Sequence, residues 1–360
     1  MTSNPQDLLE LYQISRQVQW RYQLDKVEVQ HLEKALRTIE RAIPQSLYGA
    51  DGLRTAYERR RNLDIQRELR NLFAGIREQM TGEISAMAGN AGAESVAFHT
   101  RTMTVGGLVP VNNVALSAEQ FRSFFQTTPL GGHKLKEWVN RAFNHSVIDK
   151  LKMDLDAGVL RGKGYRGLVN NIMKHMEGFT RKEAINVARS YVQSANCLAQ
   201  QAVMMANDDI VKGWRWSSVM EQGNFETGRG TCLACAANDG LEYPTGEGPP
   251  IPKHINCRCF PVSITKTYRE LGIDADELEE VARPWTERED LPIGEGGRNI
   301  EDYGKHKGNY DSWFESRGER FQRNVLGPRR YELWEKGKVD FKDFVNPKTG
   351  KLYLISELTN

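Results

Sequence analysis

Residues 231–235 read Thr-Cys-Leu-Ala-Cys, and residues 254–259 read His-Ile-Asn-Cys-Arg-Cys. Four of the five cysteines of the 360-residue chain lie in these two segments. Thiolates and imidazoles are common ligands of Zn²⁺ in tetrahedral sites, and two cysteines separated by two residues close a turn that directs both sulfurs to one ion. The two segments therefore predict a structural zinc site around which this part of the chain folds.

Five side chains in these segments can donate to a metal, although a tetrahedral site has four places. Residues two apart in an extended segment point to opposite faces, so Cys257 and Cys259 can share one ion only if the backbone is kinked between them. His254 and Cys257 can close a turn, as Cys232 and Cys235 do. The predicted ligands are Cys232, Cys235, His254 and Cys257, with Cys259 as the alternative to His254. Four protein ligands leave no place for water, which favours a structural rather than a catalytic metal.

The composition is that of a soluble and rather polar chain, with 39% hydrophobic and 27% charged residues and a formal net charge of +2. The length is enough for two or three domains. The first residues carry no basic lead followed by an apolar run, and no window approaches eighteen apolar residues, so we expect neither a signal peptide nor a membrane partner. In a reducing cytoplasm, clustered cysteines favour metal binding over disulfides. Cys197 stands apart and is expected to be an inert buried thiol.

Apolar residues recur at three- and four-residue steps over much of the chain, which predicts a mainly α fold with a small α+β part. We expect an N-terminal helical segment over residues 1–116, with a glycine-rich connector over 82–107. A helical core with the zinc motif follows over 117–270, where Ser117 and Gln120 resemble a capping box. Within it, one helix is expected to start at Thr180. Residues 271–360 form a C-terminal tail region of short elements, in which 284–298 is expected to be a connector.

Two short segments beside the cysteines have the pattern of strands. Residues 210–219 alternate aromatic and β-branched with polar residues, and residues 259–264 form a second β-like run. Together they predict a small β-ribbon that is pinned by the metal, because a ribbon of this size buries too little apolar surface to be stable alone.

Other functions were weighed on the same residues. The chain contains neither H-E-x-x-H nor G-x-S-x-G, so two common hydrolase motifs are excluded, and we expect the protein not to be an enzyme. A metal-dependent nuclease or a toxin-like passenger enzyme remains the first alternative. A DNA-binding module that uses Arg59, Arg60, Arg61 and the Arg329-Arg330 pair is the second. For the arginine triplet, a solvated helix face is the favoured interpretation.

Several motifs resemble the phage head morphogenesis family, the minor head proteins similar to the F protein of phage Mu. The similarity covers roughly residues 130–360, and its most specific part is the cysteine block. It departs from the family at Ser190-Tyr191, where Thr-Glu is typical, and at Gln222–Gly230, which is an insertion. The motifs that carry it are Arg189-Ser190-Tyr191, Gly213–Ser218, Thr231–Cys235, Asp239-Gly240, His254–Cys259, Ser312-Trp313-Phe314, Gln322–Gly327 and Leu352–Leu358.

The resemblance implies a virion protein of low copy number, located in the head interior or at the portal vertex and present in the host cytoplasm during assembly. Its implied partners are the portal protein, the major capsid protein or both, and its implied role is procapsid assembly, with DNA packaging or ejection as a further role. The N-terminal helices are then expected to dock on partner proteins.

Overall fold

The computed structural model describes residues 56–105, 111–142, 165–222, 230–274, 283–288 and 300–358. Its described part is mainly helical with a small β part, as the sequence predicts. The helices expected before residue 56 lie outside the described residues, and the predicted domain boundaries at 116/117 and 270/271 remain predictions. In the described part of the chain, no helix is long and apolar enough to cross a membrane.

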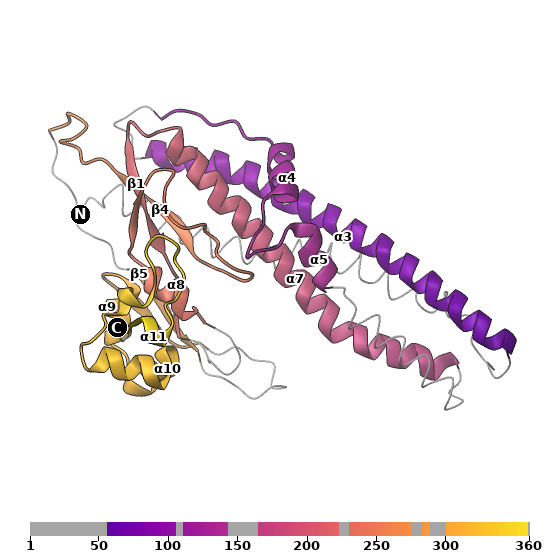
Figure 1. Cartoon of the computed structure of the whole chain (residues 1–360). Coiled ribbons are helices and arrows are strands. Elements are labelled where there is room, and N and C mark those ends of the chain that lie inside the picture. Colours follow the sequence, from indigo (N-terminus) through magenta and orange to yellow (C-terminus); the bar gives the residue numbers. More distant parts are fainter. Residues whose placement is uncertain are drawn as a thin grey trace.

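Two long helices form the shaft of the molecule (Figure 1). Helix α3 spans Ala56–Val105 and helix α7 spans Tyr165–Met205, and they pack along each other. In their interface the buried His99 Nε2 and Asn196 Oδ1 lie 3.2 Å apart. Helix α7 runs without a break past Thr180, so the predicted helix start at that residue is wrong. The only glycine just before it is Gly178, and one glycine inside a helix costs about 1 kcal/mol, which the rest of the helix can offset.

Helices α4 (Ala118–Thr127) and α5 (Leu135–Ala142) pack across the shaft. The capping box of α4 is confirmed, since Gln120 N–H donates to Ser117 Oγ and Ser117 N–H donates to Gln120 Oε1. The predicted connector over 82–107 is wrong, because residues up to Val105 are helical. A β-carbon at Gly92 would lie 2.6 Å from the Phe121 ring, so this glycine is needed for close approach of α4 and not for a loop.

A three-stranded antiparallel sheet lies at the end of the shaft (Figure 1). Strand β1 (Val211–Ser217) is central and pairs with β3 (Glu242–Pro244) and β4 (Phe260–Thr265), with Trp214 opposite both Tyr243 and Ser263. The two predicted strands are therefore present and paired, and a third strand joins them; that a metal pins them remains a prediction. Trp214 and Trp216 are both buried on it.

A second sheet has the order β2-β5-β6. Strand β2 (Met220–Gln222) runs parallel to β5 (Arg283–Arg288), and β5 is antiparallel to β6 (Ile300–His306). The expected connector over 284–298 is thus a strand at its beginning. Pro284 lies opposite Lys305 in the β5–β6 ladder but precedes the pairing with β2, which begins at Trp285; it is tolerated near the start of the strand.

The chain ends in a group of short helices, here called the C-terminal unit, residues 309–358. It contains α9 (Tyr310–Glu315), α10 (Glu319–Glu335), the 3-10 helix η2 (Phe341–Phe344) and α11 (Ile355–Leu358). Helix α10 is kinked at Gly327, which has a φ of 71° and is followed by Pro328. Helix α8 (Leu233–Asn238) lies between this unit and the β1 sheet (Figure 1).

Helix α8 separates two hydrophobic clusters. We call one the cysteine cluster; its buried members are Cys197, Met204, Val211, Trp214, Trp216, Cys235, Ile251, Cys257, Cys259, Phe260 and Val262. We call the other the aromatic cluster; it joins Met220, Leu233, Ala236 and Ala237 to Tyr310, Trp313, Phe314, Phe321, Val325, Leu326, Tyr331, Val339, Phe341, Phe344 and Val345. One short helix thus contributes to both.

Candidate metal centre

Helix α8 presents the first pair of predicted ligands. Cys232 is its N-cap residue, with extended backbone angles of −69° and 153°, and Cys235 lies in its first turn. Residues three apart in a helical turn share a face, so both sulfurs point the same way. The turn is fixed from the outside, because Thr231 Oγ1 donates a hydrogen bond of 2.5 Å to Val219 O.

The second pair lies on a tight turn. Cys257 N–H donates to His254 O at 3.1 Å, and Asn256 between them has a φ of 62°, a left-handed conformation that asparagine tolerates better than most residues. His254 Nδ1 lies 2.8 Å from Ile255 O. A hydrogen bond to that carbonyl orients the ring and leaves Nε2 free to face the sulfurs, as is usual for metal-binding histidines.

The fold brings the predicted ligands together around Cys235. His254 Nε2 lies 3.2 Å from Cys232 Sγ and 3.3 Å from Cys235 Sγ, and Cys235 Sγ lies 3.7 Å from Cys257 Sγ. Two sulfurs bound to one tetrahedral Zn²⁺ at about 2.3 Å would be roughly 3.8 Å apart, so the sulfur pair already has a suitable spacing. Cys232, Cys235 and His254 form one group that could hold a metal ion, whereas Cys257 belongs to a second group with Cys235 and Cys259.

Cys259, the predicted alternative ligand, lies beside Cys257 and Cys235. The sulfurs of Cys235, Cys257 and Cys259 all lie within 4.8 Å of one another, and so do the donor atoms of Cys232, Cys235 and His254. The segment from His254 to Cys259 is not extended, and β4 begins only at Phe260, so the alternation of a strand does not apply there. Cys235 is common to both triads.

Charge is unevenly distributed over the donors. Hydrogen bonding to Cys235 and to His254 lowers the pKa of Cys232 to about 4, and the hydrogen bond that the His254 ring donates to the Cys232 thiolate raises the pKa of His254 to about 9. Burial raises the pKa of Cys259. Cys232 and Cys257 therefore already favour the thiolate form that a metal requires, while binding through Cys235 and His254 would release protons.

Side chains of helix α7 form hydrogen bonds with the segment that carries His254, Cys257 and Cys259. Ser190 Oγ accepts a hydrogen bond of 2.7 Å from Asn256 N–H and donates one of 2.6 Å to Asn186 O. Gln193 Nε2–H donates to Cys259 O at 2.9 Å. Ser190, one of the two residues that depart from the family pattern, thus holds the ligand turn. The other, Tyr191, contacts a different segment, since its hydroxyl donates to His133 O at 3.3 Å.

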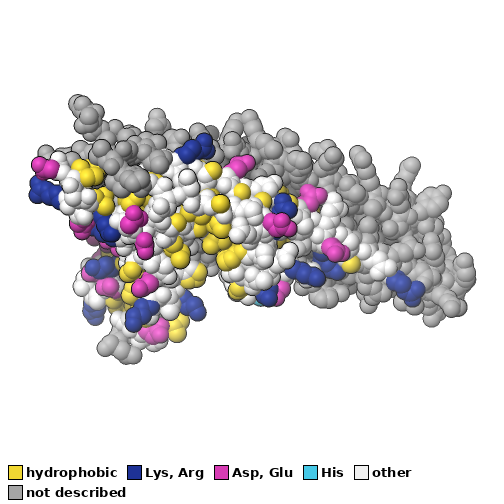
Figure 2. All heavy atoms as spheres, turned by 90° about the horizontal axis from the view of Figure 1, so that it is seen from above, with side chains coloured by type: hydrophobic (Ala, Val, Ile, Leu, Met, Phe, Trp, Pro, Cys, Tyr) yellow, Lys and Arg dark blue, Asp and Glu magenta, His cyan; other side chains and the backbone are white. Residues whose placement is uncertain are grey.

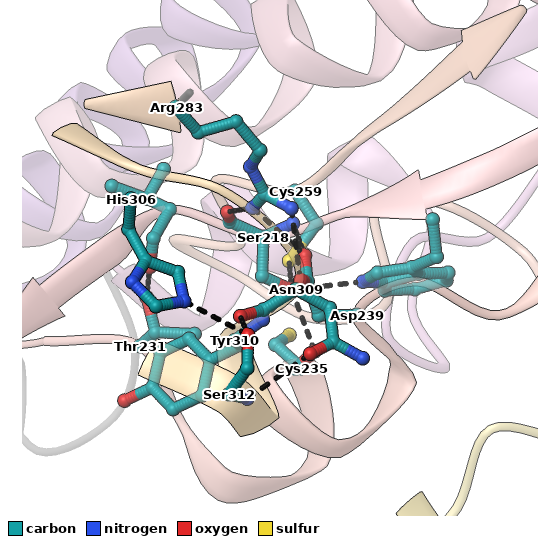
Figure 3. Close-up of polar contacts among 12 residues, drawn as sticks. Ser218, Thr231, Cys235, Asp239, Cys259, Arg283, His306, Asn309, Tyr310 and Ser312 are labelled. Carbon is teal, nitrogen blue, oxygen red and sulfur yellow. Dashed lines mark hydrogen bonds and ion pairs between the residues drawn. The ribbon is translucent and has the colours of Figure 1, made fainter. Parts of the chain in front are cut away.

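The first ligand turn is supported from the opposite side by a polar network that sequence reasoning missed (Figure 3). Ser218 Oγ donates to Cys235 O at 2.6 Å and lies 3.4 Å from Cys259 Sγ. Ser218 N–H donates to Asp239 Oδ1, whose carboxylate also pairs with Arg283 Nη1 at 2.9 Å. The Asp239-Gly240 pair was noted only as part of the resemblance, and Arg283 carries no local signal of this contact.

Cys197 lies beside the cluster without joining either triad. It is fully buried on α7, and its Sγ lies 3.6 Å from Cys259 O. Burial raises its pKa well above the ordinary value. The prediction that the Cys197 thiol is buried is confirmed.

The residues of the DNA-binding alternative lie elsewhere. The side chains of Arg59, Arg60 and Arg61 are outside the described residues. Arg329 is exposed on α10, but Arg330 donates from Nη2 to Tyr353 O at 3.0 Å and thus has a contact within the protein. On the face shown in Figure 2, described Lys and Arg side chains are interspersed with Asp and Glu side chains.

Comparisons with known proteins leave the identity open. No protein-family model, no curated protein and no solved structure matches the chain. The resemblance to the phage head morphogenesis family therefore remains a basis for a proposal.

Proposed function

We propose that the Cys/His cluster holds one structural Zn²⁺, with Cys232, Cys235, His254 and Cys257 as its ligands. The observation that carries this proposal is the approach of His254 Nε2 to two sulfurs at 3.2 and 3.3 Å. Three thiolates and one imidazole suit Zn²⁺ and fill its tetrahedral shell. Bound there, the ion supplies a cross-link between two turns that are 19–25 residues apart in the sequence, and the chain's own residues supply the supporting hydrogen bonds.

Elemental analysis tests the zinc proposal directly. Protein expressed without added metal is expected to contain about one zinc per chain, since structural sites bind the ion tightly. Cys232→Ser is expected to lose the ion and to melt at a lower temperature. An absence of zinc from the wild type, together with unchanged melting of Cys232→Ser, would refute the site.

We propose further that the chain is a non-enzymatic minor head protein of a tailed phage, associated with the portal or the inner capsid wall. The proposal rests on the motif resemblance, above all on the Thr231–Cys235 and His254–Cys259 segments. A structural metal site and a long helical shaft are compatible with a protein that joins other proteins.

Cryo-electron microscopy of intact particles of the encoding phage, reconstructed without imposed symmetry, tests this role. Density for the α3–α7 shaft is expected in contact with the portal or the inner capsid wall. Particles that lack the chain, or a chain located only outside the head, would contradict the proposal.

The two alternative functions are separated by solution assays. Incubation with DNA and RNA, with and without divalent ions, is expected to leave both polymers intact. Metal-dependent cleavage that is lost in His254→Ala would favour the nuclease. Binding to DNA whose affinity falls steeply with salt would favour the DNA-binding module, because phosphate contacts release counterions.

A further inference from the structure

Helix α8 has a metal ligand at its start and contacts to the C-terminal unit at its end. Asn238 Nδ2–H donates to Gly350 O at 3.1 Å. At Gly240 a β-carbon would lie only 3.1 Å from Asn309 Cβ, so the turn after the helix lies directly against the start of α9. Next to the second ligand turn, Lys253 Nζ donates to Thr349 O at 3.2 Å. The metal centre and the C-terminal unit therefore meet along one short helix.

The carboxylate of Asp239 is the centre of this junction (Figure 3). Its side chain is 0% exposed and that of Arg283 is 9% exposed. Oδ1 accepts from Ser218 N–H at 2.5 Å and from Arg283 Nη2 at 3.0 Å. Oδ2 accepts from Arg283 Nη1 at 2.9 Å and from Tyr310 N–H at 2.6 Å. One buried carboxylate thus joins the β1–β2 connection, strand β5 and the first residue of α9.

The same junction also reaches the sulfurs. Ser218, whose backbone binds Asp239, directs its hydroxyl to Cys235 O and lies 3.4 Å from Cys259 Sγ. Helix α8 contains six residues, and a helix of that length is not stable alone in water. Its direction is therefore set by what holds its two ends, which are the ligand turn and the Asp239 contacts.

We propose that metal binding at Cys232 and Cys235 orients helix α8 so that Asp239 docks the C-terminal unit, which makes the docking of that unit dependent on the metal. The inference rests on the proposed metal site and is independent of the proposed role in a phage head. The aromatic cluster contributes to the same docking, since Leu233, Ala236 and Ala237 belong to it. Loss of the ion would let α8 rotate, which removes these apolar contacts and the Asp239 contacts together.

Amide hydrogen exchange on the full chain, with zinc bound and after treatment with a zinc chelator, tests the inference. Zinc content is measured on both samples. After chelation, amides of residues 310–314, 321–326 and 341–345 are expected to exchange roughly tenfold faster or more, because local opening of the unit becomes easier. Amides of α3 and α7 around Val96 and Ala195 are expected to change far less. Unchanged exchange in the C-terminal unit, or an equal rise in the shaft, would overturn the inference.

Asp239→Asn gives an independent test, because it alters the junction without removing a ligand. It is expected to keep about one zinc per chain while the C-terminal unit exchanges faster, and chelation should then add little. A further rise on chelation as large as that of the wild type would show that Asp239 does not transmit the effect. Asp208→Asn, at an exposed carboxylate just after α7, is the matched control and is expected to behave as the wild type.

The buried guanidinium left by Asp239→Asn could prevent folding, so Asn238→Ala is the second variant. It removes the donor to Gly350 O and leaves the ion pair intact. It is expected to give a smaller rise in exchange of the C-terminal unit, and an unchanged rate would count against the inference. Absence of zinc from the wild type would refute the metal site itself, whereas a zinc-loaded protein whose C-terminal unit ignores chelation would refute only the coupling.

Discussion

The cysteine cluster and the aromatic cluster lie on opposite sides of helix α8, yet they gain stability from different sources. The aromatic cluster packs large rings, for example Phe314 and Phe341 with centroids 4.6 Å apart, and each ring removes much apolar surface from water. The cysteine cluster combines small thiols with two tryptophans and a few aliphatic side chains. The difference teaches that one side is stabilised by burial of large rings, whereas the other gathers thiols that the proposed metal ion would hold together.

The largest expected effect is that of Cys235→Ser, because Cys235 belongs to both triads. Structural sites bind Zn²⁺ with an apparent free energy of roughly 10–16 kcal/mol, and much of this is folding energy. We expect the variant to lose its zinc and several kcal/mol of stability, measured by elemental analysis and thermal melting. Cys197→Ser is the control, since it changes a buried thiol outside the triads and is expected to keep the ion. Retention of zinc by Cys235→Ser would break the comparison.

The substitution Trp313→Ala tests the aromatic cluster. Trp313 is 0% exposed and packs edge to face against Tyr310 and Phe321. Truncation of a buried tryptophan costs about 3–5 kcal/mol, so the free energy of unfolding is expected to fall by that amount in denaturant titrations. Zinc content should stay at about one per chain. Trp334→Ala, at a partly buried ring, is expected to cost less, and an equal cost would argue against the aromatic cluster as described.

Two variants of the cysteine cluster test whether His254 or Cys259 is the fourth metal ligand. His254→Ala is expected to weaken zinc binding by roughly a hundredfold or more, because it removes a ligand, whereas Cys259→Ser is expected to weaken it only about tenfold, as for a residue that supports the ligands from outside. Competition with a zinc-binding dye measures both. The reverse order would assign the fourth place to Cys259.

The smallest expected effect is a pH-dependent change in stability at Asp311, a residue of the C-terminal unit. Burial raises the pKa of Asp311 to about 6, from an ordinary value of 3.8. Well below pH 4 the carboxyl is protonated in the folded and unfolded states alike. Between about pH 4 and 6 the unfolded chain ionises it while the folded protein keeps it protonated, so the destabilisation grows over this window and is complete above pH 6. Asp311→Asn is therefore expected to stabilise by about 1 kcal/mol at pH 8 and by almost nothing at pH 3, after allowance for solvent screening.

Thermal melting at the two pH values checks this prediction. Asp343→Asn, an exposed carboxyl on the same unit, is the control and is expected to have little effect. An equal shift of Asp311→Asn at both pH values would show that ionisation is not the cause. A shift that disappears on chelation would instead tie the effect to the metal side.

Local pattern predicted a useful part of the fold. The strands over 211–217 and 260–265 were foreseen because aromatic and β-branched residues suit a half-buried sheet, and the capping box of α4 because it joins residues three apart. Strands β5 and β6 were not foreseen. Arg283, Pro284 and Glu287 give β5 a poor strand pattern, and one of its two partner strands, β2, is more than sixty residues away in the sequence. Gly92 shows the same limit, since a sequence does not reveal which side chain packs on a glycine.

The sequence by itself determined the turn that carries Cys232 and Cys235, because a spacing of three residues puts both sulfurs on one side of a helical turn whatever surrounds them. Only the tertiary structure decided that His254 joins this pair, that Cys257 and Cys259 group with Cys235, and that Asp239 connects the cluster to the C-terminal unit. These contacts depend on how distant segments pack: Asp239 meets Arg283 across 44 residues, and Asn238 meets Gly350 across 112. No local spacing specifies such a meeting, since it follows from the burial of α8 between two clusters.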